Sequence, residues 1–565
     1  MMKAARRSVA AALCVAVLAG GLLPAVPAWA MRDRDDDTDL RLNAYARARM
    51  AEGDRALLDA ISAYRDAIED DPSSIEVAQR SYRQAVLAGD KMLALKSAHS
   101  LDEVGLLPRD GTVLLLIDAI DRKNWKEAAL IVDRLEAEEN LAFLVPFMRS
   151  WLSLEDKPYD PPVVPLAESY ASFAVRYLEE QLLLQRLVLG DAAGAREAYT
   201  HAVRRKTAFG TRERWMMAAR FMALDERGVA TSLLEGAGVD AAHMDDALRR
   251  ARKLYRKARI TPLYGLALLM HRLAIDLSGQ TEGTAPMSIA RMASFADPGD
   301  DDIRIGVART ALLAGYADTA FSEAGLVEHN SPAWLEAQSF RMRALLDQGK
   351  EEEAVEHARA LKDKEQDSLP AWRLLGDVLI QAGDYEGAAT AYGKARDLMG
   401  GNADAALLLQ WGGALEQAGQ WEQARPLLEQ VVERAPDSAV ALNHLGYALA
   451  DRGEDLPRAI SLLEKANRLR PHNAAFIDSL GWAYYRNAQY DKALPLIRSA
   501  VAMEPGNPEL NDHHGDILWA MGRHFEARYA WKAALISLGD TKRDDMLKTA
   551  INAKIAAVPE DASAQ

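Results

Sequence analysis

Apolar residues recur at three- and four-residue spacing through much of this chain. The segments "ARPLLEQVVERA" (424–435) and "RAISLLEKANRL" (458–469) show the spacing plainly, and it is typical of helices with one apolar face. Short segments with glycine and polar residues, such as "AGDYE" (382–386) and "AGQWE" (418–422), lie between these stretches and favour turns. The pattern therefore predicts a series of helices joined by short turns.

A glycine and an alanine five residues apart recur along the second half of the chain. The alanines are 34 to 36 residues apart, and a fixed period of this length indicates a repeat protein. One unit has an extra residue between the pair, and another has Ala488 in place of the glycine. A second glycine precedes the first by seven residues, and a proline closes most units. The alanines are Ala320, Ala354, Ala388, Ala424, Ala459, Ala493 and Ala527. The earlier glycines are Gly376, Gly412, Gly446, Gly481 and Gly515, and the prolines are Pro332, Pro370, Pro436, Pro471 and Pro505.

These markers have a common physical explanation. A glycine inside a helix costs about 0.5–1 kcal/mol relative to alanine, so its recurrence requires a compensating gain. If the first helix of each unit carries the glycine and the second carries the alanine, the two helices can pack closely. Proline disfavours helix in the residue before it, and it therefore ends the second helix. We predict an all-α fold, an α-solenoid built from antiparallel helix pairs.

The text "AWRLLGDVLIQAGDYEGAATAYGKA" (371–395) resembles the tetratricopeptide repeat family. The resemblance covers residues 301–538 most strongly, with about seven units, and the whole chain is expected to hold about ten or more units. Residues 41–140 contain weaker units, in which Ala60, Ala94 and Ala128 are each 34 residues apart. Residues 141–300 are expected to be divergent helical repeats with a proline-rich bend near 155–165. Residues 539–557 are expected to form a capping helix with Leu547, Ile551 and Ile555 on one face, followed by a tail at 558–565.

The first thirty residues have the form of a secretory signal peptide. Basic residues precede an apolar segment, and Ala28-Trp29-Ala30 has the form of a cleavage site. We expect cleavage after Ala30; an uncleaved inner-membrane anchor is the alternative. Residues 31–40 are then an acidic leader. The single cysteine, Cys14, lies inside the signal, so the mature chain is expected to lack disulfides and thiolate metal sites.

Charge and motifs exclude several classes of function. The net charge is −15, and a strongly acidic chain repels nucleic acid and anionic membrane surfaces. After residue 30 no stretch is long and apolar enough to span a bilayer, so we expect no membrane insertion of the mature chain. Nucleotide-binding and hydrolase motifs are absent. We therefore expect no enzyme, no cofactor and no metal.

The resemblance to the family places a partner-binding groove on the first helix of each repeat. The side chains expected there are aromatic and acidic, and a partner with a basic or amide-rich segment fits them. Carboxylate-clamp members of the family instead use Lys, Arg and Asn, which only Asn443 and Arg486 match. The alternative is that the aromatic side chains pack between repeats. The groove residues are Asn443, Tyr447, Asp478, Trp482, Tyr485, Arg486, Asp512, Asp516 and Trp519.

The segment "NDHHGD" (511–516) is the one place that suggests chemistry. His514 occupies a position that is apolar in other units, which predicts a packed histidine. His513 precedes Asp516 by three residues, which predicts a surface His–Asp pair. The alternative is a metal site or a metal-dependent enzyme that uses His513 and Asp516.

The function that this sequence predicts is a non-catalytic scaffold in the periplasm. Its partners are expected to be one or more envelope proteins or peptides. The text "LNHLGYALADRGEDLPRAISLLEKA" (442–466), with the segment that follows it, resembles envelope repeat proteins of proteobacteria. One branch of these proteins is the lipoprotein adaptor of a carboxy-terminal processing protease, and this role is the specific alternative.

Overall fold

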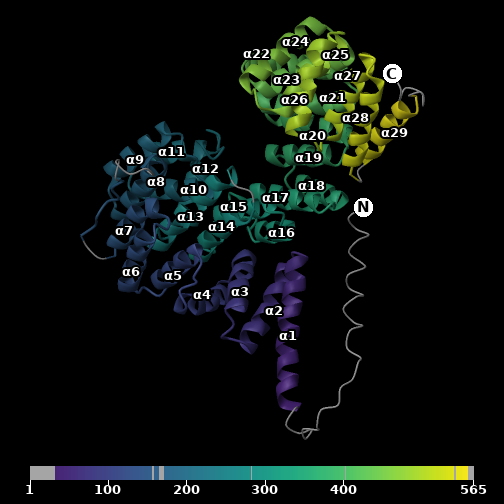
Figure 1. Ribbon diagram of the computed structural model, residues 1–565. Coiled ribbons are helices and arrows are strands. Elements are labelled where there is room, and N and C mark those ends of the chain that lie inside the picture. The colour runs from purple at the N-terminus through teal and green to yellow at the C-terminus, as the bar shows by residue number, and fades with distance from the viewer. Residues whose placement is uncertain are drawn as a thin grey trace, which may run out of the picture. The chain divides into compact units, whose positions relative to one another are not determined.

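The computed structural model describes residues 32–155, 158–164, 171–280, 283–400, 403–539 and 542–557. The described residues are helical apart from their connections and contain no strand. Adjacent helices pack as antiparallel pairs (Figure 1), which confirms the predicted all-α class built from helix pairs. The expected signal peptide and tail lie outside the described residues, and none of the described helices is long and apolar enough to cross a membrane.

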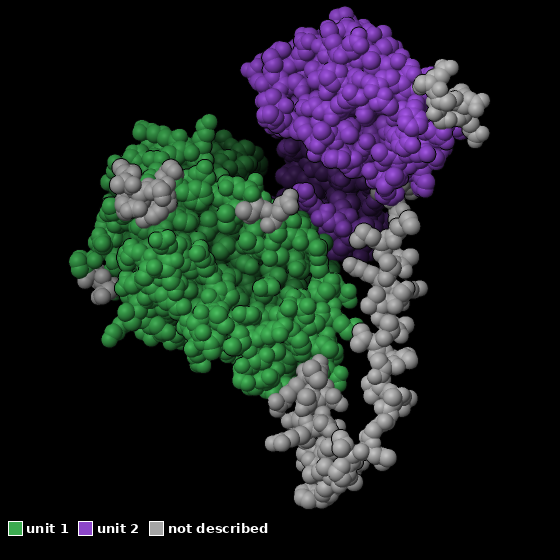
Figure 2. All heavy atoms as spheres, in the orientation of Figure 1, with its two compact units in different colours: residues 1–333 green, residues 334–565 purple. Residues whose placement is uncertain are grey.

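The chain divides into two compact units, residues 1–333 and 334–565, which Figure 2 colours separately. The helices of unit 1 are α1 (Arg32–Gly53), α2 (Leu57–Asp70), α3 (Ile75–Ala88), α4 (Lys91–Glu103), α5 (Arg109–Asp121), α6 (Trp125–Ala137), the 3-10 helix η1 (Ala142–Leu144), α7 (Val145–Ser153), α8 (Ala171–Leu189), α9 (Ala192–Arg204), α10 (Thr211–Ala223), α11 (Arg227–Glu235), α12 (Met244–Tyr255), α13 (Pro262–Ser278), α14 (Ala285–Ala296), α15 (Asp301–Leu313) and α16 (Ala317–Gly325). The helices of unit 2 are α17 (Trp334–Asp347), α18 (Glu351–Lys364), α19 (Leu369–Gln381), α20 (Tyr385–Leu398), α21 (Ala405–Gln417), α22 (Trp421–Arg434), α23 (Ala439–Arg452), α24 (Leu456–Leu469), α25 (Ala474–Arg486), α26 (Tyr490–Met503), α27 (Pro508–Ala520), α28 (His524–Ser537) and α29 (Lys542–Ala556).

The boundary between the units divides the array that the sequence placed at 301–538. The pair α15–α16 carries the first Gly–Ala marker, yet it belongs to unit 1. The reason is its packing: Ile303 lies in the core cluster of unit 1, and Asp302 accepts hydrogen bonds from the backbone N–H groups of Arg212 and Glu213 at the start of α10. Residues 31–40 were expected to form an acidic leader before the first repeat. From Arg32 onward these residues are part of helix α1. The proline-rich stretch 158–164 is free of helix.

Unit 1 closes on itself, which a simple solenoid does not do, because each repeat of a solenoid contacts only its neighbours. Helices α3 and α5 contact α14, and α5 also contacts α13 (Figure 1). One hydrophobic cluster accordingly contains side chains from α2 to α7 and from α13 to α15. Arg291 of α14 lies at this closure and is 2% exposed. Its Nε donates to the carbonyl oxygen of Leu87 at 3.0 Å, and its Nη1 donates to Glu323.

The described part of unit 2 contains six helix pairs followed by α29. We call the first helix of each pair helix A and the second helix B. The five marker glycines lie in helix A and the marker alanines in helix B, where the alanines are fully buried. A Cβ on Gly376 would come within 2.5 Å of the Tyr392 ring of the paired helix. The glycine therefore creates room for a large helix B side chain, as its recurrence in the sequence predicted.

The turn between helix A and helix B requires a left-handed residue. Gly383, Gly419, Gly453 and Gly522 occupy this place with φ between 71° and 76°, and Ala488 occupies it with φ of 55°. A non-glycine residue in this conformation is strained by roughly 1–2 kcal/mol.

We expect Ala488→Gly to stabilise unit 2 by about 0.5–1 kcal/mol, because relief of this strain exceeds the extra entropy that glycine loses on folding. The matched variant Gly522→Ala, at the same place in the next repeat, is expected to destabilise by a similar amount. Calorimetric transition temperatures of the two variants check the prediction. Equal temperatures for both variants and the wild type would contradict it.

Candidate protein-binding surface

The predicted groove residues lie on α23, α25 and α27, three successive A helices of unit 2. Each of these helices begins at a polar N-cap residue: the side chains of Ser438, Asn473 and Asn507 accept backbone N–H groups of the first turn. Such caps fix where a helix starts. Equivalent positions of the three helices therefore face the same side, and we call this side the helix A face.

Trp482 lies between repeats rather than at an open surface. It is 9% exposed, and its indole N–H donates to Asp451 at 3.1 Å across the junction of α25 with α23. Its ring lies 4.9 Å from the Tyr485 ring, centroid to centroid. Arg486 donates to the same aspartate. Trp482 therefore packs between repeats, which is the alternative given above for the aromatic side chains.

Asp478 and His513 form the next junction, between α25 and α27. The Nδ1 atom of His513 lies 2.9 Å from Asp478, and its ring stacks on Trp482 at 4.1 Å. The expected pair of His513 with Asp516 is therefore not what the structure contains, because one turn of helix separates them while Asp478 approaches directly from the neighbouring repeat. Burial alone lowers the pKa of His513, but the charge and hydrogen bond of Asp478 outweigh it and raise that pKa above its usual value.

Asp512 and Asp516 hold a lysine from the C-terminal helix. Lys554 of α29 donates to Asp512 at 2.8 and 2.9 Å and to Asp516 at 2.8 Å. Trp531 also donates to Asp516, at 3.1 Å. The basic group expected at these carboxylates is thus supplied by the chain itself. Ile551 of α29 is fully buried in the last hydrophobic cluster, with Leu547 and Ile555 packed against it.

This arrangement bears on the alternative of a metal site. The carboxylates of Asp512 and Asp516 are engaged by Lys554, and His513 is engaged by Asp478. Over the parts of the chain that the structure describes, no group of three His, Cys, Asp or Glu side chains is placed to hold a metal ion. The side chains that this alternative would use therefore contact other side chains of the same chain.

The other predicted groove residues are partly buried. The Trp519 ring packs on the paired helix of its own repeat, 4.0 Å from the His524 ring and 5.8 Å from the Trp531 ring. Tyr447 and Asn443 are half-buried on α23. The helix A face from α23 to α27 therefore consists mainly of junctions between neighbouring helices.

Substitution of Lys554 tests how firmly α29 is held. Lys554→Met leaves Asp512 and Asp516 without their cation, and we expect about 1–2 kcal/mol of destabilisation confined to α27–α29. Hydrogen-exchange mass spectrometry should show faster exchange in α29. Lys548→Met, which changes an exposed lysine of the same helix, is the control and should leave the exchange unchanged. Equal exchange in both variants would contradict the ion-pair assignment.

His514 behaves as the packed histidine that the sequence predicted. It is half-buried in α27, and its Nε2 has no hydrogen-bond partner among the described residues. Burial, with a smaller effect of the Arg498 charge, lowers its pKa to about 4. The folded chain therefore keeps His514 neutral at a pH where the unfolded chain binds a proton.

The pKa of His514 is about 4 in the folded chain and 6.5 for an ordinary histidine. This difference makes the stability of the fold depend on pH. Because the unfolded state binds the extra proton, stability falls as pH decreases from about 6.5 towards 4. In His514→Leu, which places the residue of other repeats here, we expect a smaller loss of unfolding temperature between pH 7 and pH 5 than in the wild type. His472→Leu, at an exposed histidine, should keep the wild-type loss. The hypothesis fails if the unfolding temperature of both variants falls as much between pH 7 and pH 5 as that of the wild type.

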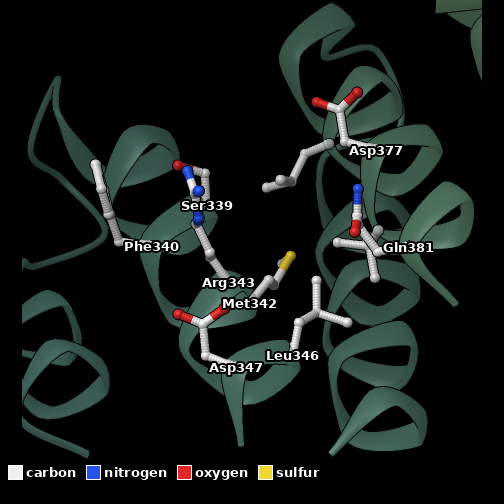
Figure 3. Close-up of a pocket in the computed structure, with 10 residues that line it drawn as sticks. Ser339, Phe340, Met342, Arg343, Leu346, Asp347, Asp377 and Gln381 are labelled. Carbon is white, nitrogen blue, oxygen red and sulfur yellow. The ribbon is translucent and has the colours of Figure 1, made fainter. Parts of the chain in front are cut away.

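An open hollow lies at the beginning of unit 2, between α17 and α19, with a volume of about 430 Å³. In Figure 3 the side chains of Met342 and Leu346 of α17 point across this space toward Gln381 of α19, whereas Phe340 points away from it. The helix A positions that define the groove in the later repeats are occupied here by Ser339, Arg343 and Asp347. The groove positions were considered in the sequence only in the later repeats, and the hollow was therefore missed. The same positions in the repeat that begins near residue 335 would have indicated it.

The hollow combines an apolar floor with polar walls. Met342 and Val378 are buried, Leu346 and Leu374 are half-buried, and Arg343 is exposed. Asp377 accepts hydrogen bonds from Tyr392 at 2.6 Å and Gln410 at 2.8 Å through a single oxygen, Oδ1. Burial raises the pKa of this carboxyl above its ordinary value. Unlike the later junctions, this part of the helix A face has room for a side chain of another molecule.

Comparison with known proteins identifies the repeats. A family described as tetratricopeptide repeat matches residues 379–445, and a second family of the same description matches residues 341–403 and 479–541. All three matched segments lie in unit 2, and most residues that line the hollow lie in the segment 341–403. A tetratricopeptide repeat-containing protein of Pseudomonas aeruginosa is 32% identical over 204 residues. This match covers 29% of the present chain, which spans about a third (34%) of the relative.

Solved structures show weaker similarity. A tetratricopeptide repeat protein of Thermus thermophilus is 23% identical, with a TM-score of 0.30, and the match covers 33% of this chain and all (100%) of that one. A chain of the Cut9–Hcn1 hetero-tetramer of the APC/C is 14% identical, with a TM-score of 0.39, and covers 90% of this chain and 96% of that one.

Proposed function

We propose that this chain is a non-catalytic scaffold that binds a segment of a partner protein in the hollow between α17 and α19. One observation carries the proposal: a space of about 430 Å³ on the helix A face, with a hydrophobic floor and polar walls. Tetratricopeptide repeats bind proteins or peptides, and recognition sites combine an apolar anchor with a few polar groups that fix orientation.

The chemistry of the hollow defines the kind of segment that fits. An apolar side chain fits against Leu346 and Leu374, and polar groups beside it can contact Arg343 and Asp347. The carboxylates expected to bind a basic partner at α25 and α27 are instead engaged by His513 and Lys554. The present proposal therefore moves the principal contact to the start of unit 2.

Site-specific photocrosslinking tests this assignment. A photoreactive phenylalanine analogue at Gln381, which is exposed and lines the hollow, should give a discrete adduct in cells. The same analogue at Lys394, exposed on α20, should not. The protein identified in the adduct should then bind at least about tenfold more weakly to Leu346→Gln and unchanged to Leu398→Gln, an exposed leucine of α20. Adducts of the same protein from both positions would refute the assignment.

The location that we propose is the periplasm. Support comes from the basic, apolar and small-residue segments of the first thirty residues. Fractionation with amino-terminal sequencing checks this: a periplasmic chain that begins at Met31 is expected. A chain that retains residues 1–30 in the inner-membrane fraction would favour the anchored alternative, and a cytoplasmic chain would refute both.

The specific alternative is an adaptor for a carboxy-terminal processing protease. It rests on the resemblance of residues 442–466 and the following repeat to envelope proteins that include such an adaptor. Degradation of a protease substrate by the purified protease, with and without this chain, separates the two proposals. Faster degradation that depends on Leu346 would join the hollow to this role, whereas unchanged degradation would leave the general scaffold.

A further inference from the structure

Unit 1 contains a second pocket, of about 440 Å³, that the proposed function does not use. It is bounded by α8, by the segment that joins α9 to α10, and by α13. Four cationic and two anionic side chains line it, an unusual excess for a chain with a net charge of −15. They are Arg176, Arg205, Lys206 and Arg272, with Glu180 and Asp276.

Arg272 is held rigidly at this pocket. Its Nε donates to Glu180 at 2.9 Å, and its Nη2 lies 2.7 Å from Glu180 and 2.6 Å from Glu213. Both glutamates are buried, at 1% and 2% exposure. The remaining nitrogen, Nη1, makes no hydrogen bond to any residue that the structure describes. A guanidinium fixed in this way presents a pre-organised N–H edge, which binds a carboxylate with little loss of entropy.

Three further cations line the same pocket as Arg272 and are weakly engaged. Arg176 lies 3.8 Å from Asp276 and Arg205 lies 3.7 Å from Glu179, both beyond hydrogen-bond distance. Asp276 is itself bonded to the Tyr177 hydroxyl at 2.8 Å. Lys206 is exposed and has no ion pair within the described parts of the chain. These side chains keep most of their hydrogen-bonding capacity for another molecule.

The buried charge of Arg272 is balanced, because Glu180 and Glu213 both contact it. The exposed cations Arg176 and Arg205 make only long ion pairs, so a carboxylate that enters the pocket can contact them directly. Ile275 and Ala208 complete the wall, so an apolar neighbour of the carboxylate also has a contact. The volume is large enough for more than one side chain.

We propose that this pocket binds an acidic peptide segment of a partner protein, with one carboxylate on Arg272 Nη1 and others on Arg205 and Lys206. The site is separate from the hollow of unit 2 and makes the chain a scaffold with two recognition sites of different chemistry. Charge-assisted hydrogen bonds from arginine to carboxylate supply both affinity and orientation.

Fluorescence anisotropy on the full chain tests the proposal. The probe is a short fluorescein-labelled peptide of alternating glutamate and alanine; its control replaces each glutamate with glutamine. We expect the acidic peptide to bind and the glutamine peptide not to bind. The double variant Arg205→Ala/Lys206→Ala should weaken binding by about tenfold or more. Both side chains are exposed, so the fold is expected to survive, which circular dichroism checks.

The control variant separates a site from general electrostatic attraction. Arg204→Ala/Lys257→Ala removes the same charge from exposed positions of unit 1 that do not line the pocket, and binding should change by less than about twofold. Equal weakening in both double variants, or equal binding of the glutamine peptide, would overturn the proposal. So would succinate alone if it bound as tightly as the peptide, since the occupant would then be a small dicarboxylate. Loss of binding at the hollow of unit 2 leaves this result unaffected.

Discussion

Replacement of Arg291 by methionine is expected to lower the free energy of unfolding of unit 1 by about 3–5 kcal/mol, because it leaves the partners of a buried charge unpaired. Arg291 joins the end of α3 to α16 through Leu87 and Glu323, and it is almost fully buried. Methionine fills a similar volume, so the loss reports the charge and hydrogen bonds rather than a cavity. Hydrogen-exchange mass spectrometry in increasing urea, followed on peptides from α3 and α14, measures the change.

Two control variants show whether the loss of stability comes from the buried charge of Arg291. Arg249→Met removes an arginine whose side chain is 70% exposed, and a surface ion pair contributes only about 0–1 kcal/mol. Glu323→Gln keeps an oxygen acceptor for Arg291 and should cost less than Arg291→Met. If Arg291→Met and Arg249→Met were equally stable, the closure of unit 1 would depend on its hydrophobic cluster alone.

The repeats could be predicted from sequence, but the closure of unit 1 could not. A period of about 34 residues needs only neighbouring helices to pack, and those contacts leave a local pattern of glycine and alanine. The contact of Arg291 with Leu87 joins residues 204 positions apart, and a single arginine in an amphipathic helix gives no sign of such a partner. The division of the chain after residue 333 follows from the same long-range packing.

The sequence predicted which side chains form the candidate surface, but not which other side chains of the chain cover them. The resemblance to the tetratricopeptide repeat family indicated the side of helix A on which Trp482 and Asp512 are expected. It did not identify what covers them, because the covering groups come from other helices: Asp451 from the preceding repeat and Lys554 from α29. Repeat position alone therefore cannot distinguish a partner-binding surface from a junction between repeats. At α17–α19 the same positions line a hollow of about 430 Å³ among the described residues.

The marker glycines provide the sharpest test of how far the repeat pattern determines packing. Gly481 and Gly515 occupy the same repeat position. A Cβ on Gly515 would overlap the ring of Trp531, which is buried and bonded to Asp516. A Cβ on Gly481 would lie 3.5 Å from its nearest neighbours, an ordinary contact. The sequence treats the two glycines alike, whereas the packing around them differs.

We therefore expect opposite effects from the same substitution. Gly515→Ala should destabilise unit 2 by about 1–3 kcal/mol, because an added methyl group in a filled core forces neighbouring side chains to move. Gly481→Ala should stabilise it by up to about 1 kcal/mol through the higher helix propensity of alanine. The two variants should thus differ by about 1–4 kcal/mol, which calorimetry of the unit 2 transition resolves. Equal effects would mean that Trp531 can move at little cost, and that the glycine at this position is retained for a reason other than the space it leaves for helix B.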